Sequence, residues 1–495
     1  MKALEPLLMR DVRQLPVHDL QTFAQLCDAR LHAGDRLLTL FGRPDVKAGP
    51  DALVITAVLQ PEAGELSVLR ASAQRGEHYP ALTGQHPGAQ IHERELWEQT
   101  DLQSDGHPWL KPVRYEGERQ QHMADYPFFK VRGQEVHEVG VGPIHAGVIE
   151  PGHFRFMCLG EHVHHLEIQL GYQHRGVEAL LLRRPPLTLA PLVESICGDS
   201  CIAYSWAYCA AVEALTDTRV SAEVEMVRGV ALEMERVAMH LAALNGLATD
   251  IAFLQGGATY GRLRTAIINA SMRMCGSRFG RGWLRPGGVR GLTEAQRLDL
   301  VQTLSAFAKD VALVNDLMVS ARSVQARFKG VGVVSQLAAQ ELGLVGLVAR
   351  ASGVALDTRT RLPGRLYAAL PADLLTEASG DCWARMQLRM REIDVSISWL
   401  LKLLGDTEID LRCGMAPLQN ELRPDLLCVS LREGARGPVV HVLETGAPGQ
   451  LLHYKVQDPS MPNWFGLALA VRDNEIADFP VCNKSFDLSY CGNDL

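Results

Sequence analysis

Residues 221–247, "SAEVEMVRGVALEMERVAMHLAALNGL", decide the fold class, because their apolar side chains recur at the spacing of a helix. The recurring positions are Val224, Val227, Met234, Val237, Leu241 and Leu244. Such a period places these side chains on one face of an α-helix. Ser221, followed by Glu223 or Glu225, is typical of a helix N-terminus. The stretch therefore predicts a long amphipathic helix that begins near residue 221.

Two later stretches have the same helical period. They are residues 293–319, "TEAQRLDLVQTLSAFAKDVALVNDLMV", and residues 381–404, "DCWARMQLRMREIDVSISWLLKLL". Long amphipathic helices bury their apolar faces by packing against one another. We therefore expect most of residues 176–405 to form a helical bundle.

The regions on either side of the bundle have strand and turn chemistry. Residues 1–125 mix short amphipathic helices with alternating strands, which predicts a small α/β domain. Residues 126–140 are expected to be a linker, and the alternation and glycines from Val136 onward predict a β-hairpin or three-stranded sheet that ends near Gly171. The predicted fold class is thus α+β, with a second domain over residues 141–495 that contains this sheet and the helical bundle.

Composition excludes several function classes. The net charge of −8 and the scattered arginines give no basic patch for nucleic acid, so no nucleic-acid partner is expected. The sequence contains no GxGxxG motif after a strand and no GxxxxGK[ST] motif, so direct NAD or ATP binding has no support. Eleven cysteines without framework spacing, in a chain that starts without a secretory signal pattern, indicate reduced thiols in the cytoplasm.

Polar residues concentrate in residues 142–156, "GPIHAGVIEPGHFRF". His145, Glu150, His153 and Arg155 lie there among glycines that allow the backbone to approach a ligand closely. The alternative is a hairpin whose polar residues face water. The sequence leaves both interpretations open.

Two other groups of residues could carry chemistry. Cys197 and Cys201 are four apart in an apolar helical segment, where they are either metal-binding thiolates or small buried residues. Glu233, Arg236 and His240 lie on one flank of the helix from residue 221, which is either a solvated stripe or a buried ionic seam.

Eight ordered motifs carry a resemblance to a known family. They are "VGPIHAGVIEPGHFRF", "LGYQHRGVEALL", "ESICGDSCIAYSWAYCAAVEAL", "LEMERVAMHLAAL", "RPGGV", "SGVALDTRTRLP", "GDCWARMQLRMRE" and the C-terminal "DPSMPNWFGLALAVRDNEIADFPVCNKSFDLSYCGNDL". From about residue 135 onward, the chain resembles the large subunit of group 4 membrane-bound [NiFe]-hydrogenases, as in formate hydrogenlyase, and the 49-kDa subunit of respiratory complex I. The N-terminal stretch resembles the 30-kDa subunit of complex I.

The resemblance implies a setting for the protein. It implies an iron–sulfur small subunit as partner, together with antiporter-like and other membrane subunits. The chain would then lie on the cytoplasmic side of the inner membrane, held there through its partners. Glu150 occupies the proton-relay position of the hydrogenases, and His145, His153 and Arg155 would line the cavity. We also expect a cofactor to contact three further residues: Asp357, Arg359 and His174.

The resemblance also implies a metal centre, which this sequence does not match. Nickel and iron in these hydrogenases are held by two C-x-x-C pairs, because soft thiolates bind nickel well. Here Cys197 and Cys491 remain in register, but Ser200 and Leu488 stand where the other two thiolates belong. We therefore expect Cys197 and Cys491 to be remnant ligands of a degenerate nickel–iron site.

Three functions remain open from the sequence. The first is an oxidoreductase subunit that passes electrons from the iron–sulfur partner to an acceptor, such as a quinone, and couples this transfer to ion translocation. The second is a non-catalytic subunit of the same complex, which transmits conformational change through the charged residues of the bundle. The third is a [NiFe]-hydrogenase with an altered ligand set.

Overall fold

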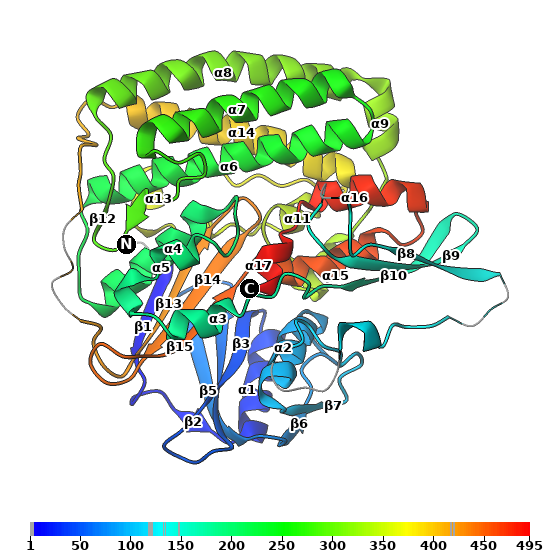
Figure 1. The fold of residues 1–495 in the computed structure, drawn as a ribbon, viewed down its shortest axis with the longest axis vertical. Coiled ribbons are helices and arrows are strands. Elements are labelled where there is room, and N and C mark those ends of the chain that lie inside the picture. The colour runs from blue at the N-terminus through cyan, green and yellow to red at the C-terminus, as the bar shows by residue number, and fades with distance from the viewer. Residues whose placement is uncertain are drawn as a thin grey trace.

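The computed structural model describes residues 4–116, 122–131, 133, 135–146, 149–415, 418 and 421–495. It confirms the α+β fold class (Figure 1). Four long helices are stacked across one side of the molecule and form the predicted bundle: α6 (Ala222–Asp250), α7 (Leu254–Cys275), α8 (Glu294–Ser320) and α14 (Cys382–Gly405). Sheets and shorter helices lie on the other side of the bundle.

The long helices begin where side chains cap them. Ser221 Oγ accepts a hydrogen bond from Val224 N at the start of α6. Thr293 and Gln296 form a reciprocal capping box at the start of α8. Asp381 Oδ1 accepts from Ala384 N, at 2.8 Å, at the start of α14. These caps satisfy backbone N–H groups that would otherwise have no partner within the helix.

The N-terminal part of the chain forms a small sheet covered by two helices. The strand order is β2 (Val17–His18), β5 (Ser67–Gln74), β4 (Ala52–Gln60) and β3 (Arg36–Pro44). The helices are α1 (Leu20–His32) and α2 (Gln90–Thr100), and two short strands, β6 (His78–Pro80) and β7 (Gln103–Asp105), pair beside them. Apolar side chains of α1, α2 and this sheet make a core of their own.

A second four-stranded sheet joins the two ends of the chain. The strand β1 (Leu7–Asp11) pairs antiparallel with β13 (Leu426–Glu433), which is followed by β14 (Pro438–Thr445) and β15 (Leu451–Gln457). Residues 7–11 therefore belong to a sheet built mainly from the C-terminal part of the chain. The division into domains at residues 125 and 141 stays a prediction.

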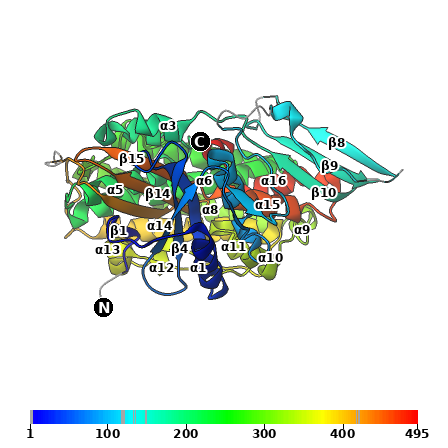
Figure 2. The same ribbon diagram turned by 90° about the horizontal axis from the view of Figure 1, so that it is seen from below.

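A third sheet has three antiparallel strands and extends away from the body (Figure 2). They are β8 (Val136–Val141), β9 (His153–Leu159) and β10 (His162–Gln169), in the order β10-β9-β8. The predicted three-stranded sheet is present, but the linker expected at residues 126–140 includes most of β8. The backbone of β8 pairs with that of β9, and the glycine and polar residues of β8 do not prevent this pairing.

Shorter elements connect these parts. They are α3 (Val177–Leu182), α4 (Ala190–Val193), α5 (Cys201–Leu215), β11 (Leu284–Arg285), β12 (Gly288–Val289), α9 (Arg322–Phe328), α10 (Gln336–Glu341), α11 (Gly346–Ala351), α12 (Thr358–Arg361), α13 (Gly364–Ala369), α15 (Ser460–Ala470), α16 (Phe479–Phe486) and α17 (Tyr490–Asp494). Across the residues that the structure describes, no helix is both long enough and apolar enough to span a membrane.

Candidate functional site

The two cysteines predicted as remnant ligands lie together. Cys197 precedes the buried helix α5, and Cys491 lies in the last helix, α17. The Cys197 thiol donates to Asp199 Oδ1 at 3.1 Å. A hydrogen bond shared with Cys491 raises the pKa of Cys197 and lowers that of Cys491. We call Cys197 and Cys491 the thiol pair.

A serine hydroxyl shares the space beside the thiol pair. Ser489 Oγ lies 3.2 Å from Cys197 Sγ and 3.5 Å from Cys491 Sγ. Ser489 is held in place because its Oγ accepts from Gly492 N at 2.9 Å, and because its own N–H donates to Ser460 Oγ at 2.9 Å. Leu488 is buried among apolar side chains. A hydroxyl therefore stands beside the thiols, where the sequence predicted the side chain of Leu488.

An arginine whose side chain is 10% exposed contacts the same site. Arg436, in the turn between β13 and β14, donates to both carboxylate oxygens of Asp199, at 2.8 and 3.0 Å. It also lies 3.7 Å from Cys197 Sγ and 3.4 Å from Asp487 Oδ2. Burial alone would raise the pKa of Asp199, but the charge of Arg436 lowers it to about 2. An ion pair therefore borders the thiol pair.

The remaining cysteines of interest do not complete a metal site here. Cys201 Sγ donates to the carbonyl oxygen of Glu194 at 3.3 Å, and burial raises its pKa to about 12. Cys482 hydrogen-bonds with Cys382, a thiol on α14. Ser200, at the second ligand position, donates to Met239 Sδ at 3.4 Å.

The donor set does not match the nickel–iron centre that the family resemblance implies. The described residues present two thiols, and hydroxyls in place of the other two sulfur atoms. Neutral hydroxyls are harder and weaker donors than the thiolates that nickel requires. The residues therefore do not fit a nickel centre held by four thiolates.

Glu150 is the residue of the polar cluster that reaches the thiol pair. It follows β8 in the loop before β9, and its carboxylate hydrogen-bonds with Cys491. Glu150 Oε2 also accepts from Tyr490 N at 3.2 Å. A carboxylate in contact with a thiol can exchange a proton with it.

The other three residues of that cluster are engaged within the three-stranded sheet. His145 Nε2 lies 2.8 Å from the carbonyl oxygen of Gly152, and His153 Nδ1 lies 3.1 Å from that of Gly142. Arg155 donates to Glu138 Oε2 at 2.6 Å. These contacts help to hold the strands and their loop, and a place for the three side chains in a cavity stays a prediction.

The three residues expected to contact a cofactor lie in two separate places. His174 Nδ1 lies 2.7 Å from the backbone oxygen of Asp494, and this contact fastens the last helix to the loop after β10. Asp357 and Arg359 are buried at the start of α12, where Arg359 donates to Asp357 Oδ2 at 2.7 Å. Their place in a cofactor site stays a prediction.

Asp357 and Arg359 belong to a larger set of buried charges, which we call the charge network. Its members are Glu233, Arg236, His240, Arg350, Asp357, Arg359, Glu392 and Glu433. None of them is more than 4% exposed. The flank of α6 predicted as either a solvated stripe or an ionic seam is therefore an ionic seam. Burial lowers the pKa of His240 to about 4, although its ring lies 2.7 Å from Glu392 Oε2.

Arg436, Asp199 and Ser489 were not predicted from the sequence. Cys197 and Ser489 are 292 residues apart, so no local spacing brings them together. Asp199 lies within "CGDSC" and Arg436 within "GARG", where each is also compatible with an ordinary polar turn. The ion pair between Asp199 and Arg436 is the feature that distinguishes them from ordinary turn residues.

Comparisons with known proteins agree with this architecture. The family model described as the respiratory-chain NADH dehydrogenase 49 Kd subunit matches residues 250–409. The chain is 28% identical to formate hydrogenlyase subunit 5 of Escherichia coli, over 84% of this chain and 77% of that protein. It is 29% identical to the membrane-bound hydrogenase subunit alpha of Pyrococcus furiosus, over 71% of this chain and 85% of that protein.

A dehydrogenase subunit is also similar to this chain. The chain is 30% identical to a subunit of the F(420)H(2) dehydrogenase of Methanosarcina mazei, over 52% of this chain and 70% of that protein. Hydrogenase and dehydrogenase subunits thus match the same chain, in agreement with the ordered motifs. The protein belongs to the family of group 4 hydrogenase large subunits and complex I 49-kDa subunits.

Proposed function

We propose that this chain is the large redox subunit of a membrane-associated complex related to complex I and to the group 4 hydrogenases. In this proposal the iron–sulfur partner supplies electrons to the region of the thiol pair, and a small acceptor such as a quinone receives them. Antiporter-like membrane subunits couple the transfer to ion translocation. The chain itself stays peripheral, on the cytoplasmic side of the inner membrane.

One observation carries the proposal that the nickel–iron site is degenerate. The thiol pair is accompanied by the hydroxyl of Ser489, and the hydroxyl of Ser200 is turned toward Met239. Removing two thiolates takes away two negative charges as well as two soft donors, and metal affinity depends on both. A site with this composition is better suited to hydrogen bonding and proton exchange than to holding nickel.

The contact between Glu150 and the thiol pair supports a role in proton movement. The carboxylate touches Cys491, while its backbone belongs to the loop between β8 and β9. A proton taken up near the thiol pair could pass to this carboxylate by one hydrogen-bonded step. Glu150 would then connect the acceptor region with the sheet that extends from the body.

The decisive experiment is to measure nickel and iron per chain by elemental analysis. The complex should be purified from its own host with its small subunit attached, and the host grown with added nickel. We expect nickel far below one atom per chain, and iron fully explained by the clusters of the partner. About one nickel per chain would contradict the proposal and favour a [NiFe]-hydrogenase with an altered ligand set.

The charge network favours a second candidate, a non-catalytic coupling subunit. Its ion pairs connect α6 with α12 and α14, and Arg236 of α6 donates to the backbone oxygen of Glu433 on β13. Movement of one of these elements would change the energy of the pairs that it shares with the others. The two candidates differ in whether substitutions beside the thiol pair slow electron transfer, and the substitution of Glu150 discussed below separates them.

A further inference from the structure

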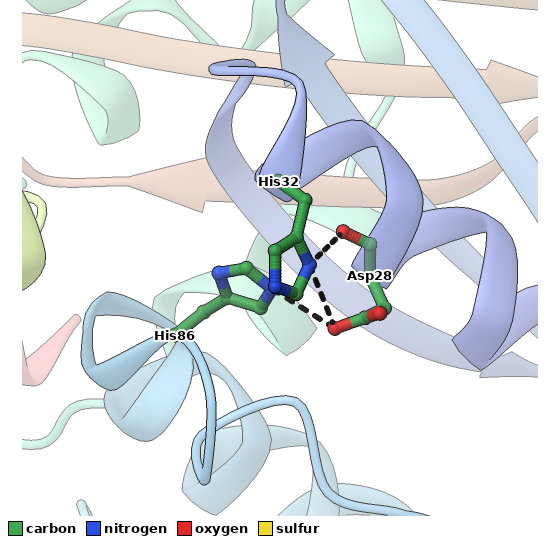
Figure 3. Close-up of side chains that lie close together, drawn as sticks. All are labelled: Asp28, His32 and His86. Carbon is green, nitrogen blue, oxygen red and sulfur yellow. Dashed lines mark hydrogen bonds and ion pairs between the residues drawn. The ribbon is translucent and has the colours of Figure 1, made fainter.

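We propose that Asp28, His32 and His86 form a binding site for a divalent transition metal ion of the zinc class. The three residues belong to the N-terminal sheet-and-helix unit, and the thiol pair is built from other parts of the chain. Figure 3 shows the carboxylate of Asp28 beside both imidazole rings. This site is independent of the redox function proposed above.

The ligand atoms have the spacing of a coordination site. Asp28 Oδ1 lies 3.3 Å from His32 Nδ1 and 3.0 Å from His86 Nε2. One ligand atom from each of the three residues can be chosen so that all three lie within 4.8 Å of one another. In tetrahedral zinc sites with bonds of about 2.0–2.2 Å, neighbouring ligand atoms are about 3.3–3.5 Å apart. The two distances to Asp28 therefore approach the edges of such a tetrahedron.

The residues come from two segments that are each held firmly. Asp28 and His32 are one turn apart in α1, so their side chains leave the same face of the helix. The other face of α1 is anchored by four buried residues: Leu20, Phe23, Ala24 and Cys27. A metal ion would thus find two of its ligands in position without rearranging the helix.

The segment that carries His86 is fixed by a buried carboxylate. Glu93, on α2, accepts hydrogen bonds from Leu82 N at 2.9 Å and from Thr83 N at 3.0 Å. The N–H of His86 in turn donates to the carbonyl oxygen of Leu82 at 2.9 Å. Ligands held on supported segments lose little freedom when they bind an ion, which favours affinity.

The chemistry and exposure of the three residues suit a metal ion with an open position. Two imidazoles and one carboxylate are a common ligand set for zinc, and three protein ligands leave a coordination position for water. The side chains of Asp28 and His32 are 44% and 58% exposed, so an ion can enter from solvent. His86 also lines a cavity of about 460 Å³, together with Leu31 and Gly34 at the end of α1.

The chain provides a matched control on the same unit. His78 Nδ1 lies 2.8 Å from Asp105 Oδ1, and both side chains are 63% exposed. This pair has one imidazole and one carboxylate, without the second imidazole that His86 supplies to Asp28. Substituting His78 therefore removes an exposed histidine–carboxylate contact without touching the proposed site.

The test uses Co²⁺ and Zn²⁺ with the full-length chain after treatment with a chelator. We expect one Co²⁺ to bind per chain with the visible absorption of a nitrogen- and oxygen-ligated ion, and Zn²⁺ to displace it. Ions bound at cysteines would instead show thiolate-to-cobalt charge transfer, and such a spectrum alone would contradict the proposal. Zn²⁺ should also raise the unfolding temperature, because it binds the folded chain.

The variants distinguish a metal site from three side chains that only form hydrogen bonds with one another. His86→Ala and Asp28→Asn should each weaken Zn²⁺ affinity by more than the roughly tenfold loss that removal of an outer-shell partner causes. His78→Ala should leave the affinity unchanged. His32→Gln, at the most exposed of the three positions, provides a variant with little effect on folding. Failure of the wild type to bind either ion, or equal affinity of the wild type and the three site variants, would overturn the proposal.

Discussion

At the scale of single residues, Glu150 is the group of the polar loop that contacts the thiol pair. Its carboxylate contacts Cys491 and accepts from the backbone N–H of Tyr490. The close approach depends on Gly152, because a Cβ atom there would lie 2.7 Å from Tyr490 Cε1. The glycine allows the loop to pack against α17 and so brings the carboxylate to the thiols.

We expect Glu150→Gln to slow electron transfer by about 100-fold, as the loss of a general acid–base group does. The amide oxygen can still accept from Tyr490 N, but the amide cannot carry a proton. The measurement is viologen-linked electron transfer through the assembled complex to a soluble quinone analogue. Glu377→Gln, in the surface pair with Arg391 of α14, is the control and should leave the rate unchanged.

The result of this substitution also separates the two candidate functions. A normal rate in a correctly assembled Glu150→Gln complex would show that the relay role is wrong. It would leave the non-catalytic coupling subunit as the better account of the chain.

Part of this region is visible in the sequence for an identifiable reason, while the roles of its residues stay predictions. The placement of Cys197, Cys491 and Glu150 in one region follows from motifs whose order and spacing are preserved in the chain. Arg436 and Ser489 carry no such local signal, since their contacts with Cys197 join distant parts of the chain. Packing of the chain, which local sequence does not encode, decides these contacts.

At the scale of secondary-structure elements, helix α6 combines an apolar face with a row of buried charges. Glu233 accepts from Arg359, at 3.2 Å, and Ser396 Oγ donates to it at 2.7 Å. Burial alone would raise the pKa of Glu233, but Arg236 and Arg359 lower it. The carboxylate is therefore ionised, and it depends on its cationic partners.

Removing one of those partners should destabilise the protein strongly. We expect Arg359→Met to lower the free energy of unfolding by about 3–5 kcal/mol, because it leaves buried carboxylates without compensation. Urea-induced unfolding of the purified chain, followed by circular dichroism, measures the loss.

An exposed ion pair that also involves α6 provides the control. Arg365 contacts Glu225 of α6 at 2.9 Å, but its side chain is 57% exposed. Arg365→Met should cost less than about 1 kcal/mol, since exposed ion pairs contribute little. Equal losses for Arg359→Met and Arg365→Met would mean that the charge network does not stabilise the bundle.

Long helices and short strands differed in how well the sequence predicted them. Residues 221–247 and 381–404 repeat the helical period many times, so α6 and α14 were predicted correctly. The strand β8 has six residues and lies where the expected linker, residues 126–140, overlaps the start of the expected sheet. Its pairing with β9 is a backbone interaction between segments, which composition does not reveal.

At the scale of the whole molecule, the N-terminal unit is joined to the rest of the chain by both apolar and charged contacts. An apolar cluster contains Phe41 and Val58 from the N-terminal sheet together with Val429 and Val440 from the C-terminal sheet. Domain boundaries predicted from the sequence could not reveal this contact, because local sequence patterns describe only residues that are close along the chain. The charged part of the interface centres on Glu444 of β14.

Glu444 accepts from two arginines of the N-terminal sheet. Arg43 Nη2 lies 2.6 Å and Arg70 Nη2 2.8 Å from Glu444 Oε1, and the carboxylate is 1% exposed. Burial alone would raise the pKa of Glu444, but the hydrogen bond and charge of Arg43, followed by those of Arg70, lower it below the usual value of a glutamate. The carboxylate is thus more acidic in the folded protein than in the unfolded chain.

This shift predicts how the contribution of Glu444 depends on pH. A carboxylate with a lowered pKa stabilises the fold fully above the pKa of the unfolded chain, and the contribution is lost as pH falls through the pKa of the folded protein. We expect Glu444→Gln to reduce the free energy of unfolding by about 3 kcal/mol at pH 7, because two buried guanidinium groups lose their counter-charge. The difference from wild type should shrink progressively below about pH 4.5.

Urea unfolding at several pH values measures this difference. Glu65→Gln, in the exposed pair with Arg10, is the control and should change the free energy of unfolding little. A difference that stays constant from pH 7 to pH 3 would show that charge at Glu444 does not hold the two sheets together, and that the apolar cluster alone does so.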